Sequence, residues 1–274
     1  MGKAEGRCER ALTEKYDKRA VPIALLRGHR SSLTSVTWSP AAPVLASAAG
    51  DEAVQLWQAD GKHVETIATD DEVIYDLAWS PDGTILASGS YDNTIRLWQA
   101  TGQSSAILDN LNVMDIAWSP DGTLLAVAAM NGLVRLMSTD KKIVVTLKSA
   151  GEKQPMATGV SWSPTGNLIA FSSIDKLIHL HTATGELVAV LKGHSNWIGG
   201  VAWSPNGNLF ASHSADGTVR LWHPASGTDD TGPWVSVRLK GHKRSVECLA
   251  WSHDGKIPAS GGEDKTVRLW AISQ

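Results

Sequence analysis

The sequence has 274 residues, of which 42% are hydrophobic and 19% are charged, so it can bury a core and does not resemble a disordered chain. Its formal net charge of −3 argues against a protein that binds nucleic-acid phosphates directly, because such proteins usually carry a strong basic excess. Two cysteines are too few for a disulfide framework or a zinc finger.

The chain begins with a charged segment. The first 20 residues mix Lys, Arg, Glu and Asp and lack the apolar stretch of a secretory signal, and no later apolar run approaches the roughly 18 residues that cross a bilayer. We therefore expect no membrane partner and a cytoplasmic location, or a nuclear one in a eukaryote. Residues 1–19 are expected to be a disordered tail or a short helix, and residues 20–274 a single domain.

From about residue 20 onward the sequence repeats. Trp-Ser-Pro or a close variant occurs six times at intervals of 39 to 48 residues, and a second position follows each of these tryptophans after 19 residues. Ten of the 12 tryptophans occupy these two positions, which chance does not produce. The first positions are Trp38, Trp79, Trp118, Trp162, Trp203 and Trp251, and the second are Trp57, Trp98, Met137, His181, Trp222 and Trp270.

Each repeat predicts four short strands, as the fifth unit illustrates. An apolar strand, Ile198 to Trp203, ends at the turn sequence Ser-Pro-Asn-Gly, and a second strand covers Leu209 to Ser212. Thr218 to Trp222 alternates as a strand does, and Trp234 to Leu239 is the fourth strand. Only Glu9 to Lys18 shows a helical period, so the chain is predicted to be all-β.

These features resemble the WD-repeat β-propeller family. The resemblance covers residues 20–272 and rests on the Gly-His pairs at 28–29, 193–194 and 241–242, the Ser-Pro-Asp-Gly turns, and strand endings such as Thr-Val-Arg-Leu-Trp at 218–222. The chain departs from the family pattern because no repeat has Asp after its terminal Trp. Units three and four also lack the terminal Trp and the Gly-His pair. Since a blade needs about 40–45 residues, the intervals leave room for six blades.

We predict that the N-terminus closes this ring. The chain stops just after the third strand of unit six, so the fourth strand must come from elsewhere. The apolar residues 21–26 precede Gly28-His29 as residues 187–191 precede Gly193-His194. Their pairing with the last blade would hide a sheet edge. The prediction is therefore an all-β, six-bladed WD-repeat β-propeller closed by an N-terminal strand that pairs with the last blade.

Three units carry Ser, His and Asp, the residue types of a hydrolase triad. Because the set occurs three times, each time with a tryptophan, we interpret it as the buried hydrogen-bond network by which the family ties together the strands of a blade. We therefore expect no catalytic residue and no enzyme, and an enzyme of unknown type is the less favoured alternative. The network residues are His29, Ser47, Asp51 and Trp57, then His194, Ser212, Asp216 and Trp222, then His242, Ser260, Asp264 and Trp270.

Other candidate sites give weaker signals. His179 and His181 share one face of a strand, which would allow a metal site, but no Cys or carboxylate partner accompanies them, so we expect neither a metal nor a cofactor. Cys248 is expected to be buried and inert. The longer loop from Ser226 to Pro233 is expected to be a solvated excursion, with contact to a partner as the alternative.

The resemblance places one ring of loops around the central channel. Three positions per unit point there: the residues three and five after the His position, and the residue before the turn Asp. These positions hold two of the three Tyr and three of the five Met, which suits an interface core, although the side chains would alternatively plug the channel. The predicted partner-binding residues are Val73, Tyr75, Tyr91, Met114, Met130, Met156, Trp197, Glu247 and Glu263.

The predicted function is a non-catalytic protein–protein interaction scaffold that presents a rigid propeller face to a peptide or protein. The acidic edge favours hydrophobic and basic residues on that partner. The alternative is a reader of a basic or modified peptide tail, as a subunit of a chromatin-type or signalling complex. We expect a monomer outside its complex. A fold alone does not set a pathway.

Overall fold

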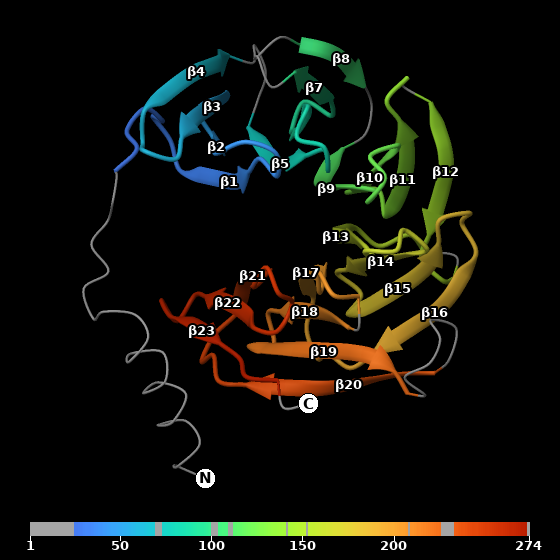
Figure 1. Cartoon of the computed structure of the whole chain (residues 1–274). Helices are drawn as coiled ribbons and strands as arrows, with labels where there is room; N and C mark the ends of the chain where they lie inside the picture. Colours follow the sequence, from blue (N-terminus) through green and yellow to red (C-terminus); the bar gives the residue numbers. More distant parts are fainter. Residues whose placement is uncertain are drawn as a thin grey trace.

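The computed structural model describes residues 25–68, 73–99, 104–108, 112–140, 142–151, 153–207, 209–225 and 233–272. Within these ranges the chain forms β-strands and no helix. Six antiparallel sheets surround a central space, and the first strand of each sheet lies nearest to it (Figure 1). The prediction of an all-β, six-bladed propeller is therefore confirmed.

Each sheet takes consecutive strands, and five of the six sheets have four strands among the described residues. Blades one to three contain β1 (Leu33–Trp38), β2 (Val44–Ala49), β3 (Ala53–Gln58) and β4 (His63–Ala68); β5 (Ile74–Trp79), β6 (Ile85–Ser90), β7 (Ile95–Gln99) and β8 (Ser104–Leu108); and β9 (Val113–Trp118), β10 (Leu124–Ala129), β11 (Leu133–Ser138) and β12 (Ile143–Lys148). Blades four to six contain β13 (Ala157–Trp162), β14 (Leu168–Ser173), β15 (Leu177–Thr182) and β16 (Leu187–Lys192); β17 (Ile198–Trp203), β18 (Phe210–Ser214), β19 (Thr218–Pro224) and β20 (Trp234–Lys240); and β21 (Val246–Trp251), β22 (Pro258–Gly262) and β23 (Val267–Leu269).

The strand register explains the constant spacing of the repeated tryptophans. In blade two, Trp79 of β5 pairs with Leu86 of β6, and Leu86 pairs in turn with Trp98 of β7. The same register recurs in blades one, three, four and five. Over an interval of 19 residues, the chain therefore forms two hairpins, and the second tryptophan lies at the same level of the sheet as the first.

The Ser-Pro-Asp-Gly turn between the first two strands is held by its own side chains. In blade two, the Ser80 hydroxyl donates to the Asp82 carboxylate (2.6 Å), and the Gly83 N–H donates to the Ser80 carbonyl (2.8 Å). Gly83 has a φ of 68°, which favours glycine. A Cβ at this position would also lie 2.6 Å from the Cβ of Ala41 in blade one. The glycine thus serves both the turn and the packing between blades.

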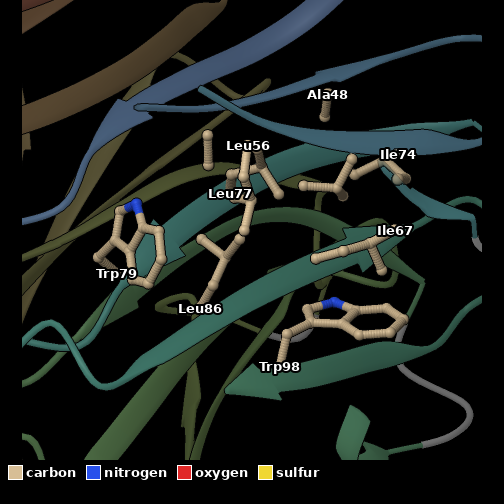
Figure 2. Close-up of a cluster of buried hydrophobic side chains, with 10 residues drawn as sticks. Ala48, Leu56, Ile67, Ile74, Leu77, Trp79, Leu86 and Trp98 are labelled. Atoms are coloured by element: carbon tan, nitrogen blue, oxygen red, sulfur yellow. The ribbon is translucent and has the colours of Figure 1, made fainter. Parts of the chain in front are cut away.

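Among the described residues, the core consists of five apolar clusters, one at each boundary from blades one and two to blades five and six. Figure 2 shows the cluster between blades one and two, in which Leu56 and Ile67 of blade one pack with Leu77, Trp79 and Trp98 of blade two. Complete burial of such a side chain contributes about 1.5–3 kcal/mol. The packing of blade faces therefore stabilises the ring.

The boundary between blades six and one differs from the other five. Trp38 of β1 is 54% exposed, whereas Trp79 at the same repeat position is 8% exposed. Val267 of β23 is 76% exposed, whereas Val219 at the same position is fully buried. The face of blade one and the face of blade six thus carry residue types that are buried at the other boundaries. Among the described residues, however, no neighbouring blade covers these two faces.

Several sequence predictions fall outside the described residues, among them the tail 1–19, residues 21–24 of the closing strand and most of the loop 226–233. The sheet of β21, β22 and β23 has three strands, and Leu25 and Leu26 are not in a strand. Closure by the N-terminus and the domain limits therefore stay predictions.

The prediction for Cys248 is wrong, because this residue is exposed. It lies on β21 at the repeat position of Asp76 and Asp115, and those residues contact the inner strand of the next blade. Among the described residues, no neighbouring blade covers Cys248 in that way. The repeat position that contacts the next blade in blades two and three is therefore exposed to solvent in blade six.

Candidate partner-binding face

In every blade, the loop before the first strand is hydrogen-bonded to the turn after the second strand. The N–H of Tyr91 donates to the carbonyl of Val73 (2.9 Å) in blade two, and the N–H of Ala215 donates to the carbonyl of Trp197 (3.1 Å) in blade five. The equivalent bond occurs in all six blades. Two of the three predicted face positions are therefore brought together at the same end of each blade.

None of the nine predicted partner-binding residues is buried, so all of them remain accessible to a partner. The exposed ones are Tyr91, Met130, Trp197, Glu247 and Glu263, and the half-buried ones are Val73, Tyr75, Met114 and Met156.

Blades two and three bring an aromatic pair and a methionine together. The rings of Tyr75 and Tyr91 lie with their centroids 5.9 Å apart and their planes tilted by 50°. Burial, and then the neighbouring Tyr91, raise the pKa of Tyr75, so the Tyr75 side chain is a neutral phenol at physiological pH. Tyr91 and Met130 also line a small hollow, which the sequence did not indicate.

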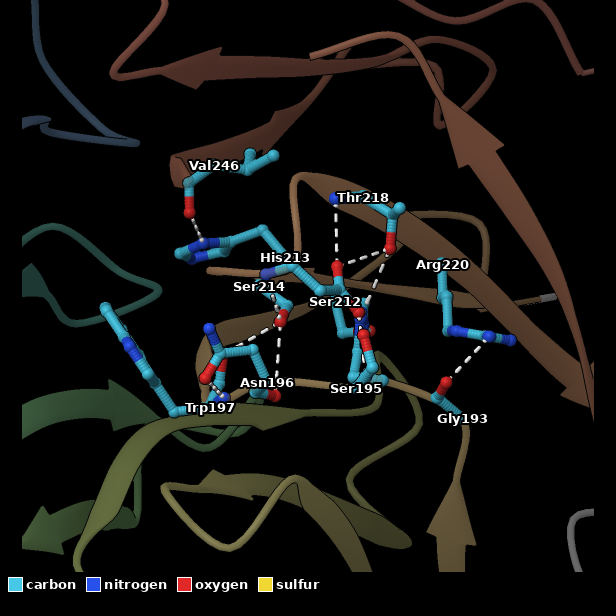
Figure 3. A network of polar contacts seen from close by, with 12 residues as sticks. Gly193, Ser195, Asn196, Trp197, Ser212, His213, Ser214, Thr218, Arg220 and Val246 are labelled. Atoms are coloured by element: carbon cyan, nitrogen blue, oxygen red, sulfur yellow. Dashed lines mark hydrogen bonds and ion pairs between the residues drawn. The ribbon is translucent and has the colours of Figure 1, made fainter. Parts of the chain in front are cut away.

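A buried histidine that the sequence prediction missed joins blades five and six. The Nδ1–H of His213 on β18 donates to the carbonyl of Val246 on β21 (2.8 Å), just before Glu247 (Figure 3). Burial lowers the pKa of His213, although this bond and the charge of Glu247 oppose the change. A Cβ on Gly199 would lie 2.5 Å from the imidazole Cε1. The sequence did contain a signal for this contact. The inner strand of unit five has a Gly-Gly pair at 199–200, and no other unit has a histidine at the repeat position of His213.

The three Ser-His-Asp sets form directional hydrogen-bond chains. In blade five, the Trp222 indole donates to Ser212 Oγ (2.8 Å), the Ser212 hydroxyl donates to His194 Nε2 (2.8 Å), and His194 Nδ1–H donates to Asp216 (2.9 Å). Figure 3 shows the surroundings of Ser212. The same chains occur as Trp57–Ser47–His29–Asp51 in blade one and as Trp270–Ser260–His242–Asp264 in blade six.

The electrostatics of these sets also favour a structural role. Burial raises the pKa of Asp216, but hydrogen bonds from Thr218, the Ser195 N–H and His194 outweigh it and hold this pKa at about 2. Burial lowers the pKa of His194, so the imidazole is neutral. Ser212 is completely buried and its proton is already donated. A nucleophile has to reach its substrate, and this hydroxyl does not.

Several hydrogen bonds join neighbouring blades, and the sequence did not predict them. Ser35 donates to Asp76 (2.9 Å), and the N–H of Val160 donates to Asp115 (2.7 Å). Asp76 and Asp115 also hydrogen-bond to each other. Two carboxylates in contact cannot both be charged, so one of them holds a proton. Burial raises the pKa of both, and Asp76 helps to raise that of Asp115 well above its usual value.

The variant Asp115→Asn is expected to be more stable than the wild type at pH 8 and not at pH 4. Because the folded-state pKa of Asp115 is raised, the stability of the carboxyl pair is fully present below the usual Asp pKa and is lost as the pH rises through the folded-state pKa. The amide keeps a donor for Asp76 without needing a proton. Each pKa unit corresponds to about 1.4 kcal/mol, so a difference in Tm of several degrees is expected. Thermal unfolding of both proteins from pH 4 to 8 measures it, and a difference in Tm independent of pH would contradict the assignment.

The histidine pair considered for a metal instead packs on an aromatic ring. Phe171 stacks against both His179 (4.9 Å between centroids) and His181 (5.5 Å), and burial lowers the pKa of both histidines. In the part of the chain that the structure describes, no three His, Cys, Asp or Glu side chains are grouped closely enough to hold a metal ion. Among the same residues, no helix is long and apolar enough to span a membrane.

Two family models match the chain. Residues 31–192, more than half of the sequence, match the family described as eukaryotic translation initiation factor eIF2A, and residues 185–223 and 234–271 match the WD domain, G-beta repeat. No curated protein matches the chain. The chain therefore belongs to the WD-repeat β-propeller family, with residues 31–192 in the group described as eukaryotic translation initiation factor eIF2A.

Proposed function

We propose that this protein is a non-catalytic scaffold that binds a protein or peptide on the face formed by the hydrogen-bonded blade ends. The observation that carries the proposal is the exposure of Tyr91, Met130 and Trp197 at that one end. Aromatic and methionine side chains are enriched in interface cores because they supply contact area and adapt to irregular shapes. The serines that would support hydrolysis are buried instead.

The charges on this face favour a partner segment with hydrophobic and basic residues. Glu247 lies at the start of blade six and Glu263 at the turn after its second strand, and both are exposed. Blade six is next to blade five, which carries Trp197. An Arg or Lys on the partner can form charge-assisted hydrogen bonds with these carboxylates. Outside such a complex, the chain is proposed to be monomeric and cytoplasmic, or nuclear in a eukaryote.

Trp197→Ala and Tyr75→Ala are each expected to weaken partner capture by at least about 1–2 kcal/mol, a loss of roughly 5–30-fold in affinity. The tagged protein is incubated with a lysate of the parent organism, and the captured proteins are identified and quantified by mass spectrometry. Lys240→Ala on an outer strand is the control and should capture as the wild type does. If both aromatic variants retain the same partners at unchanged levels, this face is not the binding site.

A second candidate function follows from the match of residues 31–192 to a translation initiation factor. In this role the scaffold would hold proteins of a translation-initiation complex. The expected result is that the captured partners are initiation factors or ribosomal proteins and that the tagged chain sediments with ribosomal subunits. Capture of unrelated proteins and free sedimentation would contradict it.

The reader of a basic or modified peptide tail is the remaining alternative, favoured by the two glutamates beside blade five. It predicts that synthetic Lys-rich peptides bind, and that acetylation or methylation of their lysines changes the affinity. Equal, weak binding of every such peptide would exclude this function.

A further inference from the structure

A small hollow lies between the exposed ends of blades two and three. Tyr91 and Asn93 line it from the turn after β6, and Asn112, Val113 and Met130 line it from blade three. Its volume is about 150 Å³. Of these lining residues, Val113 is buried, whereas Tyr91 and Met130 are exposed.

The walls of the hollow are held by the backbone. Tyr91 is fixed by its hydrogen bond to Val73, and Met130 by the equivalent bond from its N–H to the carbonyl of Asn112 (2.9 Å). Asn93 and Asn112 have φ values of 73° and 46°, a region that Asn tolerates better than most residues. These bonds fix the backbone from which the lining side chains extend, so a ligand need not order that backbone on binding.

The size and lining of the hollow restrict what it can hold. Cofactors and drug-sized ligands need pockets of about 300–1,000 Å³, so a hollow of about 150 Å³ has room for a single side chain. None of the five lining residues is charged, so nothing here neutralises a phosphate or a carboxylate. The Tyr91 ring, the Met130 thioether and Val113 suit an apolar group, and the two asparagine amides can bond to a peptide backbone.

We propose that this hollow is the subsite for one apolar side chain of the partner segment, of the size of leucine, methionine or phenylalanine. The amides of Asn93 and Asn112 bond to the backbone on either side of that residue. The assignment rests on the proposed function, because it names one subsite on the same face. Blades two and three lie across the central space from blades five and six (Figure 1), so the apolar residue and the basic residue that meets Glu247 are separated along the partner segment.

The test uses a phage-displayed library of random linear peptides, selected on the full-length protein. Enriched peptides are synthesised, and their Kd is measured by fluorescence anisotropy against the wild type, Met130→Lys, Ile174→Lys and Trp197→Ala. Ile174 is the matched control, because it occupies the repeat position of Met130 in blade four and is similarly exposed (42% against 36%) but does not line the hollow. Thermal unfolding checks that each variant is folded.

We expect Met130→Lys to weaken binding at least about tenfold and Ile174→Lys less than about threefold. Replacement of the shared apolar residue of the peptide by Ala should weaken binding to the wild type and not to Met130→Lys, as coupled partners do in a double-mutant cycle. Equal losses for the two lysine variants, or enriched peptides with no shared apolar residue, would overturn the subsite. The proposed function stands in that case if Trp197→Ala still weakens binding, and it fails too if no peptide is enriched or if none of the variants matters.

Discussion

Removal of residues 1–26 is expected to lower the Tm of this protein by roughly 8–16 °C or to cause aggregation. Removal of residues 1–18 is expected to change the Tm little. Blade six supplies three strands among the described residues, whereas the other five blades supply four. An unpaired sheet edge favours aggregation, and the predicted closing strand is what would cover it.

The position of Gly28-His29 supports closure onto blade six. His29 contacts Ser47 and Asp51 of blade one as His194 contacts Ser212 and Asp216 of blade five. The residues before Gly193-His194 form β16, the outer strand of the preceding blade. By the same geometry, we expect residues 21–26 to run along the outer edge of the blade that precedes blade one in the ring, which is blade six.

The size of the expected fall in Tm follows from the faces of blades six and one, which no neighbouring blade covers among the described residues. Closure would bury side chains such as Trp38 and Val267, whose counterparts Trp79 and Val219 are buried, and each contributes about 1.5–3 kcal/mol. A loss of about 4 kcal/mol lowers the Tm of a domain of this size by roughly 8–16 °C. Differential scanning calorimetry on the full chain and on both deletions measures the effect. Equal Tm values for the full chain and the longer deletion would exclude closure by this strand.

A disulfide provides an independent test of the closed ring. Cys248 and Ser35 occupy, in blades six and one, the repeat positions at which Asp76 and Asp115 hydrogen-bond across the boundary between blades two and three. Closure should therefore bring the two positions within reach of each other. In a Cys8→Ser background, Ser35→Cys is expected to form a disulfide with Cys248 under mild oxidation, detected by peptide mapping. A free Cys248 thiol after oxidation would argue for an open ring.

The blades were predictable because each repeats a local pattern. The spacing of Trp79 and Trp98 encodes the register of three strands, and the Ser-Pro-Asp-Gly sequence encodes the turn that Gly83 makes possible. Strand limits shifted by one or two residues, as in β18, which begins at Phe210 and extends to Ser214. Six repetitions of the pattern made these small errors unimportant for the fold.

The contacts between blades were harder to predict, because they join residues about 40 positions apart whose side chains vary from unit to unit. Asp76 and Asp115 occupy one repeat position, but the other units have Ser, Gly or Cys there, so no motif marked it. The hollow at Tyr91 and Met130 arises from the relative placement of two blades, which the sequence of neither blade contains. The error at Cys248 has the same origin, since its exposure depends on the neighbouring blade.

The second large effect is expected for His194→Ala, which should destabilise the protein by about 1–3 kcal/mol. The imidazole both accepts the Ser212 proton and donates to Asp216, so its removal leaves a buried hydroxyl and a buried carboxylate without their partner. Because Asp216 has a pKa of about 2 in the folded protein, its contribution to stability is present above the usual Asp pKa and is lost as the pH falls from about 4 to 2. The cost of the substitution should therefore be largest near neutral pH.

Thermal unfolding of wild type and His194→Ala at pH 7 measures this cost, which should appear as a fall in Tm of roughly 2–12 °C. Asp70→Ala is the matched control, because unit two has Asp in place of the network histidine, and it should cost less. Hydrolysis of p-nitrophenyl acetate by both proteins is measured in parallel. If His194→Ala removed a hydrolase activity while leaving the Tm unchanged, the histidine would act in catalysis, and the buried position of Ser212 would have to open for substrate.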